Sequence, residues 1–141
     1  MLTKEMLQEL HSAWLPNITD QGLDRLIELL EQNSPLLIHG SFTRAVPQGC
    51  LVTQIAWNHL ATCHLTQEAG ISWLNHVAGL NPATSVILRA WDHCGTNNWE
   101  LRNDLLTVFK EDRLARKQET QPRKMLRSAF TELSGMRSKT V

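Results

Sequence analysis

The stretch 66-TQEAGISWLNHVAGLNPATSVILRAWDHCG-95 decides the fold of this chain. Apolar residues recur at helical spacing on both sides of a four-residue corner, which predicts two helices that meet there. Gly79 can adopt the left-handed conformation that ends a helix. Asn81 is a suitable N-cap for the next helix, and Pro82 fits its first position. The second helix is expected to reach about Cys94, so the sequence predicts a charge-poor helical hairpin at the centre of the fold.

The same corner resembles the turn of LacI-type helix-turn-helix repressors. In the run Val77 to Thr84, alanine, glycine and an apolar residue precede a polar cap and a second helix, as in that motif. The resemblance covers only this short run. It departs from the motif at Asn75, where a small residue is expected, and at Ser85, where a buried Val or Ile is expected. The resemblance implies a DNA-binding helix, and the alternative is a plain helical hairpin in the core.

A DNA-binding interpretation requires polar side chains near the second helix and cations for the phosphates. The basic C-terminal segment supplies the cations. Acidic residues are interspersed among them, however, and aromatic stacking partners are few, which favours a solvated helical face over phosphate contact. The candidate DNA contacts are Asn81, Thr84, Ser85, Arg89, Arg116, Lys117, Arg123 and Lys124.

Length and composition predict a single helical domain. The chain has 141 residues, and 42% of them are hydrophobic, which is ordinary for one globular domain. The apolar periodicity predicts an all-α fold, a single compact domain of about six or seven helices. We expect this domain to span residues 1–133 and residues 134–141 to form a disordered tail.

Apolar spacing and capping residues predict where the other elements lie. Thr19 is the expected N-cap of the second helix. The candidates for the inner face of the third helix are Val52, Ile55, Ala56, His59, Leu60 and Cys63. The predicted elements are a helix at 3–14, a helix from Thr19 to before Asn33, a helical turn or short strand at 35–39, a helix at about 50–62, a helix from Asn97 to about 118, a linker at 119–121 and a last helix from Pro122.

Charge is unevenly distributed along a chain whose formal net charge is zero. Residues 1–109 carry five Lys and Arg against ten Asp and Glu, whereas residues 110–141 carry nine against four. Halves of opposite sign indicate either a basic tail that binds an acidic partner or a tail that folds back on its own acidic surface.

Cysteine usage and hydropathy predict a cytoplasmic protein. The three cysteines, Cys50, Cys63 and Cys94, are odd in number and widely spaced, so reduced thiols are expected. The N-terminal residues lack a basic region followed by an apolar block, so we expect no signal peptide. No uncharged apolar run reaches the length of a membrane span, and we expect no insertion into a membrane.

Histidine and cysteine in the middle helices raise the possibility of a metal site or a thiol enzyme. The candidates are His59, Cys63 and His93, of which the first two are four residues apart. The chain has no Cys-x-x-Cys, no His-Glu-x-x-His and no Gly-rich phosphate loop. We therefore expect no metal, no cofactor and no enzymatic activity.

These patterns lead to two main functional hypotheses. The first is a small cytoplasmic regulatory or adaptor protein that binds another protein through an exposed apolar groove. The alternative is a helix-turn-helix transcriptional regulator that binds DNA. The sequence leaves the oligomeric state open.

Overall fold

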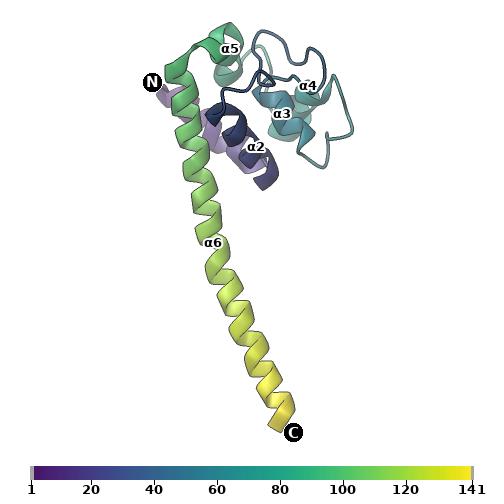
Figure 1. Ribbon diagram of the computed structural model, residues 1–141, viewed down its shortest axis with the longest axis vertical. Coiled ribbons are helices and arrows are strands. Elements are labelled where there is room, and N and C mark those ends of the chain that lie inside the picture. Colours follow the sequence, from purple (N-terminus) through teal and green to yellow (C-terminus); the bar gives the residue numbers. More distant parts are fainter. Residues whose placement is uncertain (1, 141) are drawn as a thin grey trace.

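The computed structural model describes the backbone of residues 2–140 and the side chains of residues 2–119. In these residues the fold is all-helical, as predicted, with six α-helices and no strand. Helices α1 to α5 and the first part of α6 gather into one compact domain, and α6 then continues away from it (Figure 1). None of the helices described is both long and apolar enough to cross a membrane. The predicted limits at residues 133 and 134 stay predictions.

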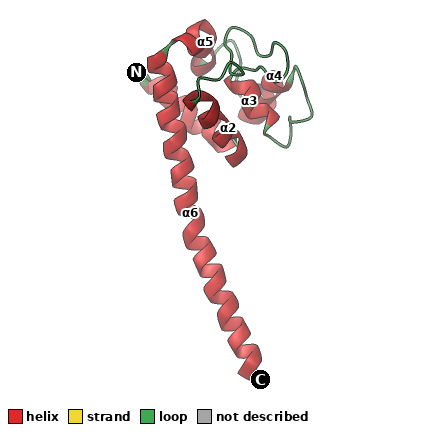
Figure 2. Ribbon diagram, viewed as in Figure 1, coloured by secondary structure: helices red, strands yellow, loops and turns green. Residues whose placement is uncertain are grey.

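The helices are joined by short π and 3₁₀ segments and by two long loops, which flank α3 (Figure 2). Helix α6 is one helix, without the linker predicted at 119–121. The bounds are α1 Lys4–Glu9, a π segment Leu10–Trp14, a 3₁₀ turn Leu15–Asn17, α2 Asp20–Glu31, α3 Leu51–Trp57, α4 Ala69–Ser72, a π segment Trp73–Ala78, α5 Val86–Cys94, a 3₁₀ turn Gly95–Asn97 and α6 Trp99–Thr140.

Local capping explains where the first two helices begin. The Thr3 hydroxyl accepts the Met6 amide at 3.2 Å, and the Thr19 hydroxyl accepts the Gly22 amide at 3.0 Å. Each bond satisfies an amide that would otherwise lack a partner in the first helical turn. The predicted cap at Thr19 is confirmed.

The central corner follows the prediction on one side only. Gly79 has φ 69° and ends the π segment, as expected for a left-handed cap. Helix α5, however, begins at Val86, so the predicted start at Asn81 and Pro82 is wrong. The Asn81 side chain accepts the Ala83 amide at 2.9 Å and closes a separate turn. The cap is Ser85, whose hydroxyl accepts the Leu88 amide at 3.2 Å.

The predicted end of the third helix is also wrong, because α3 ends at Trp57 and not near Thr62. The Thr62 hydroxyl donates to the Ala56 carbonyl at 2.7 Å, and the Asn58 amide donates to the Gln54 carbonyl at 2.9 Å. These side chains take the carbonyl groups that another helical turn would use. The inward positions expected beyond α3 are therefore wrong as well: Leu60 is 91% exposed and Cys63 is exposed.

The segment 35–39, expected to be a helical turn or a strand, is neither. It is a turn followed by one isolated bridge between Leu37 and Gly49. The buried Gln54 side chain donates to the carbonyls of Leu36 and Pro47 at 3.0 and 3.1 Å. A single glutamine thereby organises the loop between α2 and α3.

Three fully buried tryptophans anchor the core: Trp14, Trp73 and Trp91. Trp14 and Trp73 meet edge to face, with ring centroids 5.7 Å apart. The Trp73 indole N–H donates to the Asn17 carbonyl, and the Trp91 indole N–H donates to the Ile38 carbonyl. Each ring therefore fills the core while its polar edge fixes a neighbouring segment.

Candidate functional site

The residues proposed for a DNA-reading helix have different surroundings. Asn81 and Thr84 are exposed on the turn before α5, and Arg89 is exposed on α5 itself. Ser85 is 1% exposed, and its hydroxyl is used inside the protein. The side chains of Arg123 and Lys124 lie outside the described residues.

The N-terminus of α5 is occupied by a carboxylate from α1. Glu9 accepts hydrogen bonds from the Ser85 hydroxyl at 2.9 Å and from the backbone amides of Val86 and Ile87, each at 3.1 Å. It also accepts the Trp14 indole N–H at 3.0 Å. The amides that could bind a phosphate at this helix end are therefore already bound to a negative charge.

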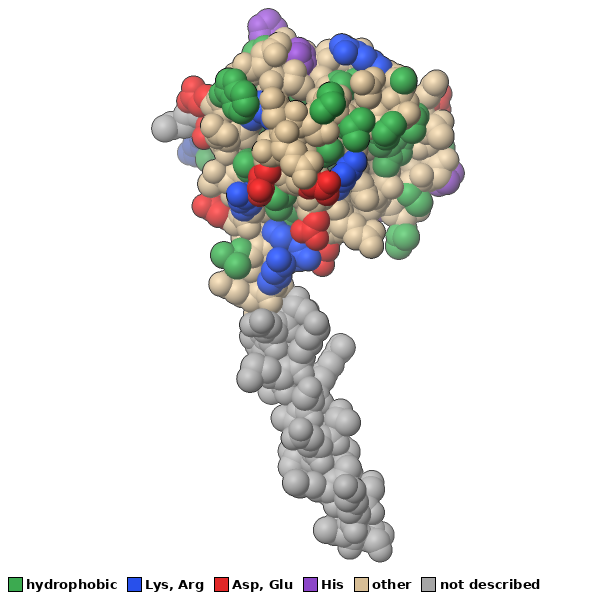
Figure 3. Space-filling model, in the orientation of Figure 1, with side chains coloured by type: hydrophobic (Ala, Val, Ile, Leu, Met, Phe, Trp, Pro, Cys, Tyr) green, Lys and Arg blue, Asp and Glu red, His purple; other side chains and the backbone are tan. Residues whose placement is uncertain are grey.

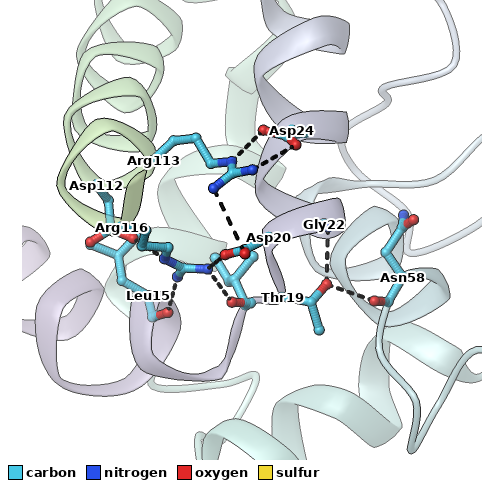
Figure 4. A network of polar contacts seen from close by, with 10 residues as sticks. Leu15, Thr19, Asp20, Gly22, Asp24, Asn58, Asp112, Arg113 and Arg116 are labelled. Carbon is cyan, nitrogen blue, oxygen red and sulfur yellow. Dashed lines mark hydrogen bonds and ion pairs between the residues drawn. The ribbon is translucent and has the colours of Figure 1, made fainter. Parts of the chain in front are cut away.

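The first basic residues of the C-terminal segment pair with acidic residues of α2 (Figure 4). The Arg116 guanidinium donates to the carbonyls of Leu15 and Ile18 at 2.7 and 2.8 Å, and it also contacts Asp20 and Asp112. Figure 3 shows basic and acidic side chains next to each other where α6 leaves the domain. Within residues 110–119, the charged helix thus packs back on its own acidic surface.

Two further ion pairs extend this contact between α2 and α6. Arg113 donates to both carboxylate oxygens of Asp24, at 2.7 and 3.4 Å, and Lys110 lies 3.0 Å from Glu31. Lys117 is exposed. We call the contact formed by Arg113 and Arg116 with α2 the α2–α6 clamp.

The three candidate metal ligands have separate environments. The His59 ring is half-buried and accepts the Ala61 amide, Cys63 is exposed in the loop after α3, and His93 is exposed on α5. Among residues 2–119, no three His, Cys, Asp or Glu side chains are placed to hold a metal ion together.

A cavity of about 320 Å³ lies between the C-terminal end of α2, the following loop and the start of α6. Its charged side chains are Arg44 and Arg102, and it also includes His39. No acidic residue belongs to the lining, so the cavity is polar with an excess of positive charge. The full lining is Asn33, Ser34, Pro35, Leu37, Ile38, His39, Arg44, Thr96, Asn97 and Arg102.

Arg102 is the unusual residue of this cavity, because its side chain is charged and only 3% exposed. Its guanidinium donates to the Leu30 carbonyl at 3.1 Å and to the Thr96 carbonyl at 3.3 Å. Among the described residues, no carboxylate lies within ion-pair distance of it. Burial lowers the pKa of Arg102 from its ordinary value, but an arginine remains charged at neutral pH.

The histidine of the cavity is held by the segment before α6. The Thr96 hydroxyl lies 2.6 Å from Nδ1 of His39, and the Thr96 amide donates to the same nitrogen at 3.4 Å. A nitrogen that accepts an amide N–H carries no proton, so this contact favours the tautomer with the proton on Nε2. Asp92 interacts electrostatically with His39, and burial raises the pKa of the Asp92 carboxyl.

An exposed tryptophan lies beside this cavity. Trp99 is 60% exposed, in contrast to the buried tryptophans of the core. The Arg102 guanidinium lies over its ring, 5.1 Å from the centroid, which is the geometry of a cation–π contact. We call Trp99 and the cavity residues Arg44 and Arg102 the Trp99 face.

The residues of the Trp99 face were not predicted from the sequence to form a site. One signal was present, because Arg102, Leu105 and Phe109 have the spacing of one helical stripe, and a charge on an apolar stripe indicates burial. The contact between His39 and Thr96 could not be predicted from the sequence, because these residues are 57 positions apart.

Comparisons with protein families, with curated proteins and with solved structures found no match for this chain.

Proposed function

We propose that this chain is a small, non-enzymatic adaptor or regulatory protein that binds another protein at the Trp99 face. The observation that supports this most is the 60% exposure of Trp99 with a guanidinium stacked on its ring. Tryptophan and arginine are enriched among the residues that dominate protein–protein binding energies. An exposed tryptophan already held in place by a buried arginine loses little conformational entropy on binding.

The charges of the face define the partner it fits. Arg44 and Arg102 line the cavity and no acidic side chain does. The complementary partner is a protein segment with an apolar side chain to cover Trp99 and an acidic group directed towards the cavity. We place this interaction in the cytoplasm, consistent with three free cysteines.

Affinity capture from cell extract with three purified proteins tests the proposal. The proteins are the natural chain, Trp99→Ala and Leu60→Ala, where Leu60 is an equally apolar but distant residue with 91% exposure. We expect one protein to bind the natural chain and Leu60→Ala and to be lost from Trp99→Ala. Titration of that purified partner against the three proteins must then give similar affinities for the natural chain and Leu60→Ala and a weaker affinity for Trp99→Ala. Equal capture by all three proteins, or capture by none, contradicts the proposal.

DNA binding is the second candidate, and we rank it below protein binding. Exposed Arg89, Asn81 and Thr84 support it, whereas the Glu9 carboxylate at the N-terminus of α5 opposes an approaching phosphate. A gel shift with mixed-sequence duplex DNA at rising salt separates the candidates. A band shift that weakens steeply with salt and is reduced by Arg89→Gln favours DNA. We expect no such shift.

A further inference from the structure

We propose that the cavity between α2 and α6 binds a phosphate monoester dianion through the side chains of Arg102 and Arg44. This inference goes beyond the proposed adaptor function, because it names a small ligand that binds in the cavity without a partner protein.

The first support is that the buried cation Arg102 has no counter-ion among residues 2–119. A charged side chain that is 3% exposed is costly unless an opposite charge or hydrogen bonds compensate it. Arg102 has two carbonyl partners and, among the described residues, no carboxylate. A bound anion would supply the missing charge, and charge-assisted bonds to arginine are among the strongest in proteins.

A purely structural role for Arg102 uses only part of its side chain. The bond to the Leu30 carbonyl places a cation at the C-terminus of α2, where the helix dipole favours it. With the bond to Thr96, this uses two of the five N–H groups that a guanidinium carries. The other donors belong to a side chain that lines the cavity. Capping of α2 and binding of an anion are therefore compatible.

The cavity favours a dianion over a single carboxylate. Its two positive charges, the buried Arg102 and the exposed Arg44, match the two negative charges of a phosphate monoester. Thr96 and Asn97, which belong to the 3₁₀ turn before α6, add polar groups near the positive end of the helix dipole. The Asp92 carboxyl interacts electrostatically with His39, but Asp92 is not among the residues that line the cavity.

The size of the cavity limits the compounds it takes. At about 320 Å³ it lies at the lower end of the range for ligand pockets, roughly 300–1,000 Å³. A small phosphorylated metabolite or a phosphorylated side chain fits this volume better than a dinucleotide cofactor. Both sources share the phosphate monoester that the two arginines recognise.

Isothermal titration of the full chain with inorganic phosphate, at fixed ionic strength and neutral pH, tests the inference. We expect saturable binding at one site, lost in Arg102→Gln and weakened about fivefold or more in Arg44→Gln, since each variant removes a charge-assisted bond. Arg89→Gln removes an exposed cation outside the cavity and should bind like the natural chain. Acetate should bind at least about tenfold more weakly because it carries one charge.

Several results overturn the inference. They are the absence of saturable binding, equal binding of acetate and phosphate, unchanged binding in folded Arg102→Gln, and equal weakening in Arg44→Gln and Arg89→Gln. If Arg102→Gln does not fold, the comparison of Arg44→Gln with its control Arg89→Gln decides, because both arginines are exposed. Titration with phosphoserine and with a sugar phosphate then distinguishes the two sources. Failure of phosphate binding leaves the Trp99→Ala capture result unaffected, so each proposal can be refuted without refuting the other.

Discussion

Glu9 is a single carboxylate that joins α1 to α5. It accepts four hydrogen bonds, from the Trp14 indole, the Ser85 hydroxyl and the amides of Val86 and Ile87. Glu9→Ala leaves these donors without their partner, and we expect a loss of about 2–4 kcal/mol in the free energy of unfolding. Urea denaturation measures this loss.

Glu5→Ala is the matched control for Glu9→Ala. Glu5 is an exposed acid in the first turn of α1, and its removal should cost less than about 1 kcal/mol. Equal losses in the two variants would mean that the bonds of Glu9 contribute little beyond general charge effects.

Two glycines are needed for different reasons, which a pair of substitutions separates. A side chain at Gly79 meets nothing within 4 Å, but φ there is 69°, so Gly79→Ala should cost about 1–2 kcal/mol in backbone strain. A Cβ at Gly95 would overlap the ring of Trp91, so Gly95→Ala should cost about 1–3 kcal/mol in overpacking.

Asparagine at the same two glycines is the control, because it tolerates the left-handed region. Gly79→Asn should be milder than Gly79→Ala, whereas Gly95→Asn should be worse than Gly95→Ala. Thermal unfolding of the four variants checks this order, and a reversed order at either position would refute the assigned cause.

Thiol reactivity should differ between Cys50 and Cys63. Burial raises the pKa of the Cys50 thiol above its ordinary value, so the buried thiol stays protonated and unreactive at pH 8, whereas Cys63 is exposed. In a titration with Ellman's reagent at pH 8, Cys63 should react quickly and Cys50 only on unfolding. The variant Cys63→Ser should lose the fast phase, and persistence of that phase would contradict the assignment.

At the scale of elements, α2 and α6 are joined by part-buried and exposed contacts, and these two kinds of contact should differ in how much they stabilise the fold. Arg116 donates to two backbone carbonyls and contacts two carboxylates. We expect Arg116→Ala to cost about 2–3 kcal/mol, because it removes a charged donor from two part-buried carbonyls. Lys110→Ala, which removes an exposed ion pair with Glu31, should cost less than about 1 kcal/mol.

Lysine at position 116 tests the geometry of the clamp. Its ammonium has three donors and no planar fork, so Arg116→Lys should recover less than half of the loss measured for Arg116→Ala. Chemical denaturation at two salt concentrations measures both variants. Full recovery by lysine would show that charge alone stabilises the clamp.

The elements that sequence reasoning predicted well are those fixed by local signals. The helix start at Thr19 and the left-handed end at Gly79 depend on residues within a few positions. The end of α3 and the start of α5 depend on competition among side chains, such as Thr62 taking the Ala56 carbonyl and Ser85 bonding Glu9. Such competition is decided by packing, so a sequence pattern does not determine it.

The candidate site was less predictable than the fold. The Trp99 face brings together a loop residue, Arg44, and two residues of α6 that are more than fifty positions away. A histidine from the same loop completes the cavity. The sequence placed Arg102 on an apolar stripe, but only the tertiary arrangement shows that no carboxylate within residues 2–119 pairs with it.

For the whole molecule, ion pairs within residues 2–119 balance part of the uneven charge of the chain. The acidic residues of α2 pair with Lys110, Arg113 and Arg116 of α6. The cations that line the cavity, Arg44 and Arg102, have no such pairing among these residues. Among the described residues, the Trp99 face therefore offers a ligand two cations that have no carboxylate partner.

Mapping by two-dimensional ¹⁵N NMR of the intact chain during titration with inorganic phosphate tests this central claim most directly. We predict saturable shifts concentrated on the Arg102 side-chain N–H, the backbone amides of Thr96 and Asn97 and the Trp99 indole N–H, with Arg89 and Lys117 unmoved. Absence of shifts at Arg102, or shifts of equal size at Arg89 and Lys117, would contradict it.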